Sequence, residues 1–287
     1  MRDPAELAAV LHHHGLAAPE SLSHPPKAAG GHWLHKPLGS SSGAGIDFWQ
    51  ANSCGGEDRG YYFQRHVEGL PCAAIYVADA QTSRLLGVTQ QLIGTDWTGA
   101  APFHYSGSLG PLPLAPATRA ELERLGEVLR REFGLRGLFG VDGVLSDGAF
   151  WTIEVNPRYT ASVEVLERVA GCRAIELHMR ACMGEAPAVA PLGESSIGPS
   201  MAPRAAGKVV LFARQPLAGR DALWQQAIAA QHGAAWPSVA DIPAAGAAMA
   251  AGAPILTLFA DGADLGQAEA RLRDAASVWA SRLYYSP

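Results

Sequence analysis

The stretch GVDGVLSDGAFWTIEVNPR, residues 140–158, decides the fold that the sequence predicts. Two apolar, β-prone runs flank the turn sequence SDG at 146–148, which is typical of a β-hairpin. Side chains alternate between the two faces of a strand, so Glu154 and Asn156 point the same way. Asp142 can meet them from the neighbouring strand. The stretch therefore predicts a hairpin with three oxygen-bearing side chains on one face.

This set of side chains favours a metal site. Two carboxylates and an amide suit Mg²⁺, a hard cation that takes oxygen ligands and completes its shell with water and phosphates. Mn²⁺ accepts the same ligands. We therefore expect Asp142, Glu154 and Asn156 to bind Mg²⁺. The alternative is a set of ordinary polar residues on a sheet surface. The strand also carries apolar side chains that we expect on the opposite face: Trp151, Ile153 and Val155.

A second candidate site follows the predicted strand 32–37. There Lys36 precedes a loop of small residues, GSSSGAGI at 39–46. An ammonium group and exposed backbone N–H groups are what a polyphosphate needs, because both neutralise the same oxygens. The spacing is not that of a P-loop, since the lysine precedes the loop and no GK[ST] closes it. The pattern predicts phosphate binding, unless the loop is a flexible surface linker.

A third element, QRHVEG at 64–69, ends the predicted strand 61–66. Extended backbone at this point can offer an N–H and a C=O to the edge of an adenine, and Gln64 can add a side-chain contact. Taken alone, the segment is typical of a strand end and a turn. We therefore treat it as a candidate hinge only in combination with the other two elements.

Hydrophobic periodicity predicts the remaining elements. The strand runs 61–66, 72–78 and 85–91 are expected to form an antiparallel meander. Asp3 is expected to cap the first helix. The other expected elements are helices at 4–16, 116–133, 162–170 and 173–183, a linker at 186–204, strands at 208–213 and 255–259, and a helix at 265–283. We expect the domains 1–30 (helix and connector), 31–185 (core) and 186–287 (C-terminal lobe).

Composition limits the class of protein. The 287 residues are 48% hydrophobic and 17% charged, which is typical of a packed globule. A net charge of −5 gives no basic surface, so we expect neither a nucleic acid nor a membrane as partner. The four cysteines form no CxxC pair, and no secretory signal or long apolar run is present. We expect a cytoplasmic protein that acts on small molecules.

Taken in order, WLHKPLGSSSGAGI, QRHVEG and the hairpin ending in IEVNPR resemble the ATP-binding blocks of the ATP-grasp superfamily, over about residues 30–170. The resemblance implies an α+β fold in which two lobes clamp ATP. It also implies a small C-terminal lobe. The domain that precedes the ATP-grasp core in many members is expected to be reduced or absent, so either the chain is short at its N-terminus or a partner subunit or a second copy supplies that wall.

The resemblance also implies roles for individual residues. Lys36 contacts the α- and β-phosphates, and Arg158 neutralises the incoming carboxylate or the pentavalent phosphorus; these two are the expected catalytic residues. The metal ligands hold Mg²⁺ between the β- and γ-phosphates. The loop residues implied to cover the phosphates are Ser40, Ser41, Ser42, Gly43 and Gly45. Those implied to hold adenine are Gln64 and the backbone of Arg65, His66 and Val67.

The activity that the resemblance implies is an ATP-dependent carboxylate–amine ligase, which forms an amide through an acyl phosphate on a small-molecule carboxylate. Small ATP-grasp proteins of C1-carrier cofactor biosynthesis, such as tyramine–glutamate ligase, are similar. The alternatives are an ATP-grasp kinase, a carboxylase-like enzyme and a non-catalytic nucleotide-binding subunit.

Two further departures from the family pattern concern the residues of the site. Gly140 stands where members similar to D-Ala–D-Ala ligase have an arginine, which leaves Arg158 to carry that role. Residues 71–72, Pro-Cys, occupy the place of a ribose-binding acid.

Overall fold

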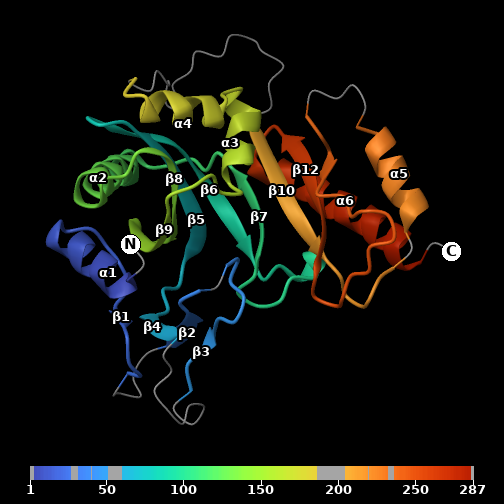
Figure 1. Cartoon of the computed structure of the whole chain (residues 1–287), viewed down its shortest axis with the longest axis horizontal. Coiled ribbons are helices and arrows are strands. Elements are labelled where there is room, and N and C mark those ends of the chain that lie inside the picture. Colours follow the sequence, from blue (N-terminus) through green and yellow to red (C-terminus); the bar gives the residue numbers. More distant parts are fainter. Residues whose placement is uncertain are drawn as a thin grey trace. The chain divides into compact units, whose positions relative to one another are not determined.

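The computed structural model describes residues 3–26, 32–39, 41–50, 60–185, 204–218, 220–231 and 236–285. The chain packs as two compact units, each assembled from three stretches (Figure 1). Unit 1 consists of Met1–Val88, Pro113–Val163 and Arg173–Ser195. Unit 2 consists of Thr89–Leu112, Glu164–Cys172 and Ser196–Pro287. The predicted linker falls almost entirely outside the described residues.

Unit 1 contains a small antiparallel sheet of four strands in the order β1-β4-β2-β3 (Figure 1, blue). The predicted strand 32–37 is confirmed as β2. On one face of this sheet, aromatic rings pack together, and His35 stacks on Tyr61 with ring centroids 4.2 Å apart. The opposite face is therefore left to the polar side chains of β2 and β4. The bounds are β1 Ser21–Leu22, β2 Trp33–Pro37, β3 Asp47–Phe48 and β4 Tyr61–Arg65.

The larger sheet of unit 1 has the strand order β6-β5-β8-β9. The predicted hairpin is confirmed, and its turn residues Asp147 and Gly148 have φ of 50° and 81°. Two successive positive φ angles are those of a type I′ turn, whose twist suits a two-residue hairpin loop. The bounds are β5 Leu70–Ala78, β6 Ser83–Ile93, β8 Gly137–Ser146 and β9 Ala149–Asn156.

The predicted meander of three consecutive strands is wrong. Only β5 and β6 are neighbours, because β4 pairs with β1 and β2 in the small sheet. Between β4 and β5, Gly69 has a φ of +154°, and a Cβ built there would meet the backbone carbonyl of Leu145. A side chain there would collide with β8, so the chain enters the larger sheet at a residue that only glycine suits.

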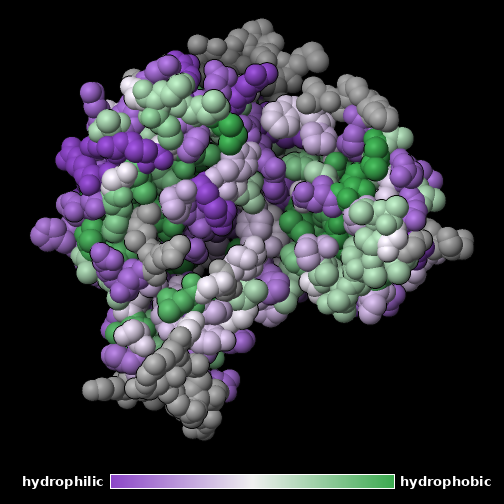
Figure 2. Space-filling view, viewed as in Figure 1, coloured by the Kyte–Doolittle hydropathy of each residue, from purple (hydrophilic) through white to green (hydrophobic). Residues whose placement is uncertain are grey.

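The helices of unit 1 follow the predicted pattern. Asp3 caps the first helix, accepting hydrogen bonds from the N–H groups of Ala5 and Glu6, and this helix ends three residues earlier than predicted. In the second, Leu122 and its helical neighbours are buried, and the outward face is hydrophilic (Figure 2). The Tyr76 hydroxyl of β5 donates to the Leu122 carbonyl at 2.9 Å. The bounds are α1 Pro4–His13, α2 Pro116–Phe133 and α4 Ala174–Cys182.

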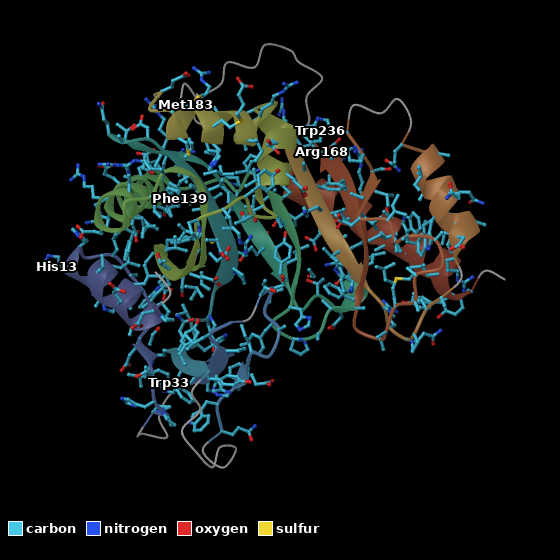
Figure 3. The ribbon with its side chains drawn as sticks, viewed as in Figure 1. His13, Trp33, Phe139, Arg168, Met183 and Trp236 are labelled. Carbon is cyan, nitrogen blue, oxygen red and sulfur yellow. The ribbon has the colours of Figure 1, made fainter. Side chains whose placement is uncertain are left out.

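Unit 2 has the strand order β11-β12-β10-β7-β6, with β6 continuing from unit 1. In its core Trp224 and Trp279 stack with ring centroids 6.3 Å apart. Arg168 pairs with Asp261 and lies over the ring of Trp236 (Figure 3). The bounds are η1 Asp96–Thr98, β7 Tyr105–Gly110, α3 Val163–Ala170, β10 Ala205–Phe212, α5 Asp221–Ala229, β11 Val239–Ala240, β12 Pro254–Gly262 and α6 Leu265–Tyr284.

The predicted C-terminal strands and final helix are confirmed as β10, β12 and α6. The sequence did not predict β7 or α5, which are short and, in β7, rich in Gly and Ser. Among the described helices, none combines the length and apolar character needed to cross a bilayer.

Candidate active site

Lys36 lies on the polar face of the small sheet. In the β2–β4 register Lys36 pairs with Tyr62, and Leu34 pairs with Gln64, so these four side chains share one face. The Lys36 Nζ donates a hydrogen bond of 2.8 Å to Gln64 Oε1, and it lies 5.3 Å from the centroid of the Tyr62 ring. Lys36 is only 8% exposed and Gln64 only 2%. Gln64 Nε2 in turn donates to Ser21 Oγ at 3.3 Å.

The electrostatics link this lysine to the hairpin carboxylates. Burial lowers the pKa of Lys36 to about 8, and the negative charges of Glu154 and Asp142 act in the opposite sense. Burial also raises the pKa of Tyr62, with the charge of Glu154 adding to the effect. Lys36 is therefore a cation poorly compensated by protein groups, and additional negative charge beside it would be favourable.

The hairpin brings the predicted metal ligands together. Asp142 lies opposite Glu154 and Gly140 lies opposite Asn156, so the three oxygen-bearing side chains share one face. Asn156 Nδ2 donates a hydrogen bond of 2.8 Å to Asp142 Oδ2, whereas Glu154 is exposed. Val155 is buried on the opposite face, as the alternation predicts.

A β-bulge lies beside this set. The ladder shifts between Asp142 and Gly143, which leaves Ile153 as an extra residue on β9. Trp151 therefore pairs with Val144 and shares the face of Asp142. The prediction that Trp151 lies on the opposite face is wrong, because simple alternation does not hold across a bulge. Such bulges are frequent next to active sites, where they re-aim a side chain.

Arg158 adjoins the amide of the metal-ligand set. Its Nη2 donates to Asn156 Oδ1 at 3.3 Å and its Nη1 donates to the Tyr159 carbonyl at 3.2 Å. The place that an arginine at position 140 would need is filled, because a Cβ at Gly140 would lie 2.9 Å from Thr160 Cγ2. Arg158 is therefore the guanidinium beside this hairpin end.

The small-residue loop joins β2 to β3. Ser40 lies outside the described residues. The Ala44 N–H donates to the Ser41 carbonyl at 3.2 Å, and the two residues between them, Ser42 and Gly43, have φ of 56° and 82°. A positive φ is costly for serine and is a kind of strain that is common at ligand clamps. Gly45, with a φ of 75°, continues the loop, which is largely exposed.

The hinge segment has part of its backbone already in use. The Arg65 N–H donates to the Glu20 carbonyl at 2.9 Å, and the His66 N–H donates to the His32 carbonyl at 2.8 Å. The Arg65 guanidinium lies over the ring of Trp33, which Figure 3 labels in the small sheet. Val67 comes directly after His66 in the chain. The N–H groups of Arg65 and His66 are thus committed to strand pairing.

The residues present fit Mg²⁺. Asp142, Glu154 and Asn156 supply oxygen ligands of the kind this cation prefers, on one face and with room for water and phosphate oxygens at the exposed Glu154. Lys36 and Arg158 carry the charges that a polyphosphate beside that ion needs.

Two side chains of the site were missed by the sequence prediction. Tyr62 could have been found, because it lies two residues before Gln64 and so on the same face of its strand. Thr160 gave no signal beyond its place after Arg158. Its buried hydroxyl has no hydrogen-bond partner within the described part of the chain.

Comparisons with known proteins agree with this architecture. The ATP-grasp domain family matches residues 1–162 of the 287. The formate-dependent phosphoribosylglycinamide formyltransferase of Variovorax paradoxus is 32% identical over 80 residues, which are 28% of this chain and 20% of the relative. The match thus spans about a fifth of the length of that curated relative.

Solved structures share the fold at low identity. The L-amino acid ligase of Bacillus licheniformis gives a TM-score of 0.69 at 15% identity, over 96% of this chain and 71% of the other. The N5-carboxyaminoimidazole ribonucleotide synthetase of Thermotoga maritima gives 0.63 at 14%, over 96% and 71%. The biotin carboxylase of Campylobacter jejuni gives 0.66 at 14%, over 95% and 65%. The chain therefore belongs to the ATP-grasp family, whose cofactors are ATP and Mg²⁺, and it has that family's α+β fold.

Proposed function

We propose that this protein is an ATP-dependent ligase that joins a small-molecule carboxylate to an amine through an acyl phosphate. The observation that carries the proposal is the buried Lys36, held by Gln64 and influenced by the charges of Asp142 and Glu154. A desolvated cation near an oxygen-rich metal set is an arrangement suited to a polyphosphate.

In this proposal one group of residues binds the phosphates of ATP and a second group holds the metal ion. Lys36 neutralises oxygens of the α- and β-phosphates, and the loop at 40–45 covers them with backbone N–H groups. Asp142, Glu154 and Asn156 hold Mg²⁺, which when bound neutralises charge on the β- and γ-phosphates.

The hinge has a narrower role than the sequence alone indicates. Because Gln64 accepts a hydrogen bond from Lys36, we propose that Gln64 contributes to ATP binding by positioning the lysine as well as by a contact with adenine. The strand-paired N–H groups of Arg65 and His66 are not available to adenine. We therefore propose that adenine is read by Val67 and by the hinge carbonyls.

The reaction then proceeds in two balanced steps. A carboxylate oxygen attacks the γ-phosphorus, and the bond from that phosphorus to the β-bridging oxygen breaks, releasing ADP. The amine nitrogen attacks the acyl carbon, phosphate leaves with the bonding electron pair, and the amine loses a proton to phosphate or water. Arg158, placed by its bond to Asn156, neutralises the charge that develops on the transferring group.

Similar structures support a ligase but do not fix the substrates. The L-amino acid ligase shares the fold, as do the N5-carboxyaminoimidazole ribonucleotide synthetase and the biotin carboxylase described above. Fold alone does not determine function, which depends on the site. We propose a small carboxylate and an amine as substrates, in a reaction of cofactor biosynthesis, and a second copy or partner subunit as a contributor to the substrate pocket.

An acid-by-amine matrix scored by ADP release tests this function. We expect ADP only when both an acid and an amine are present, in equal amount to the amide formed. ADP release with a single phosphate acceptor would indicate a kinase, and a requirement for bicarbonate would indicate a carboxylase. ATP binding without ADP in any mixture would indicate a nucleotide-binding subunit. The Glu154→Gln variant serves as the inactive control.

A further inference from the structure

We propose that His32, His66 and Glu68 bind a transition-metal ion of the Zn²⁺ class at one end of the small sheet. Each residue offers one ligand atom, and the three atoms all lie within 4.8 Å of one another. These residues are not part of the Mg²⁺ set on the hairpin. The proposal does not depend on the ligase reaction.

The register of the strands brings the two histidines together. Trp33 pairs with Arg65, and the next pair outward is His32 with His66, joined by the 2.8 Å bond from the His66 N–H to the His32 carbonyl. Directly opposed residues of an antiparallel ladder have side chains on the same face, with Cβ atoms ~4.5–5.5 Å apart. Backbone pairing therefore sets the spacing of the two Cβ atoms and keeps both imidazoles on one face. Glu68 follows two residues after His66.

The donor chemistry selects the metal. Two imidazole nitrogens and one carboxylate oxygen suit Zn²⁺ and its neighbours Co²⁺ and Ni²⁺, whereas Mg²⁺ prefers oxygen ligands alone. Bonds of ~2.0–2.2 Å in a tetrahedron place ligand atoms roughly 3.3–3.6 Å apart. From separations of at most 4.8 Å, the three atoms need to approach one another by no more than about 1.5 Å. Small side-chain rotations achieve that.

The surroundings favour the ion. The Phe48 ring makes edge contacts with both imidazoles, with centroids 5.9 Å from His32 and 5.3 Å from His66, and so restricts their orientation. The guanidinium of Arg65 lies over Trp33, on the opposite face of the ladder, so this cation does not compete for the carboxylate. His32 and Glu68 are exposed, which leaves a path for the ion and positions for water.

The test uses the full chain without an affinity tag, stripped of metal by a chelator and dialysed into excess Mg²⁺ to saturate the oxygen-ligand site. We expect one equivalent of Zn²⁺ in equilibrium dialysis, and a visible absorption band with Co²⁺ that Zn²⁺ abolishes. His32→Gln and Glu68→Gln should each weaken Zn²⁺ binding by ~100-fold or more, since loss of an outer partner alone typically costs ~10- to 100-fold.

A matched control comes from α1, where His13 and His14 have ring centroids 5.2 Å apart and His14 lies 3.0 Å from Glu132. The double variant His13→Gln/His14→Gln should bind Zn²⁺ as the wild type does. Circular dichroism confirms that each variant is folded. The proposal is overturned if the wild type binds no Zn²⁺, if His32→Gln and Glu68→Gln bind it unchanged, or if the α1 variant loses it.

Discussion

Lys36 and Gln64 are joined across the β2–β4 ladder by a buried hydrogen bond of 2.8 Å, in which the ammonium donates to the amide oxygen. Gln64 is thus the residue that fixes the direction of the lysine. Because the pair lies on two strands, the cation is positioned before any nucleotide arrives.

Replacing Gln64 with Leu should therefore misplace Lys36. A buried charged donor without its acceptor costs about 1–3 kcal/mol, so we expect lower stability in urea and an ATP affinity reduced about 10-fold. Ser21→Ala, which removes only the other partner of Gln64, should cost about 1 kcal/mol or less. Calorimetric titration and urea unfolding measure both. Equal losses in the two variants would contradict a positioning role.

Lys36→Ala tests the phosphate contact itself. Mg-ATP should raise the melting temperature of the wild type, because a ligand that binds only the folded state stabilises it, and should raise that of Lys36→Ala much less. Lys208→Met is a matched control, since Lys208 is also buried but pairs with Glu164 in unit 2. If the Lys36 and Lys208 variants show the same shift with Mg-ATP, the assignment of Lys36 to the phosphates fails.

The pKa of Lys36, lowered by burial to about 8, gives the ATP affinity a pH dependence. Between pH 8 and pH 10.5, the ordinary pKa of a lysine, the folded state binds fewer protons than the unfolded state. The unfavourable effect of Lys36 on stability, full below pH 8, is therefore relieved as the pH rises through that window. Phosphates favour the charged lysine, so ATP binding at about pH 8.5 should take up protons, and affinity should fall as the pH rises further.

Calorimetric titrations in two buffers of different ionisation enthalpy measure this proton uptake. Lys36→Arg keeps the charge in a group that does not titrate in this range, so it should bind ATP with little proton uptake. Undiminished uptake in Lys36→Arg would assign the titration to another group.

Glu154→Gln tests the metal set. The substitution removes a charge from an exposed side chain, so the fold should persist with a melting temperature close to that of the wild type. Turnover should be lost, because Mg²⁺ is held less firmly by an amide than by a carboxylate. ADP release under the best acid and amine pair is the assay. A fully active variant would falsify the metal role of Glu154.

Arg158→Ala tests charge neutralisation during transfer. An interaction made mainly in the transition state lowers kcat and kcat/KM together, and we expect a decrease of about 100-fold, or ~2.7 kcal/mol. The KM for ATP should change little. Steady-state kinetics separate the two parameters, and a variant altered only in its KM for ATP would move Arg158 to nucleotide binding.

The local elements were predictable because their signals lie within a few residues. The type I′ turn at Asp147 and Gly148, the cap at Asp3 and the periodicity of α2 each depend on neighbours in the chain. Pairing between strands was not predictable in the same way, since nothing local states that β4 joins β2 rather than β5. The close approach of Gly69 to Leu145, at the entry to the larger sheet, likewise involves residues far apart in the sequence.

The same distinction between local and long-range signals applies to the candidate site. Asp142, Glu154 and Asn156 could be brought together on paper because a hairpin has one dominant register. The bulge at Ile153 could not be foreseen, and it changed the face of Trp151. The partners of Lys36 could not be predicted either, because its hydrogen bond to Gln64 joins residues that are 28 positions apart and lie on two different strands.

That bulge has a consequence for how the hairpin tolerates change. Ile153 lies between Glu154 and the turn, so the one-residue offset is absorbed before the ladder continues towards Ser146 and Ala149. Insertions or deletions of matched residue pairs at the tip would lengthen or shorten the hairpin without sliding Asp142 away from Glu154. Deleting Ile153 alone would remove the offset and leave a regular ladder, in which Thr152 still pairs with Gly143 and Trp151 with Val144. The bulge therefore allows β9 to carry one extra residue while Asp142, Glu154 and Trp151 keep one face.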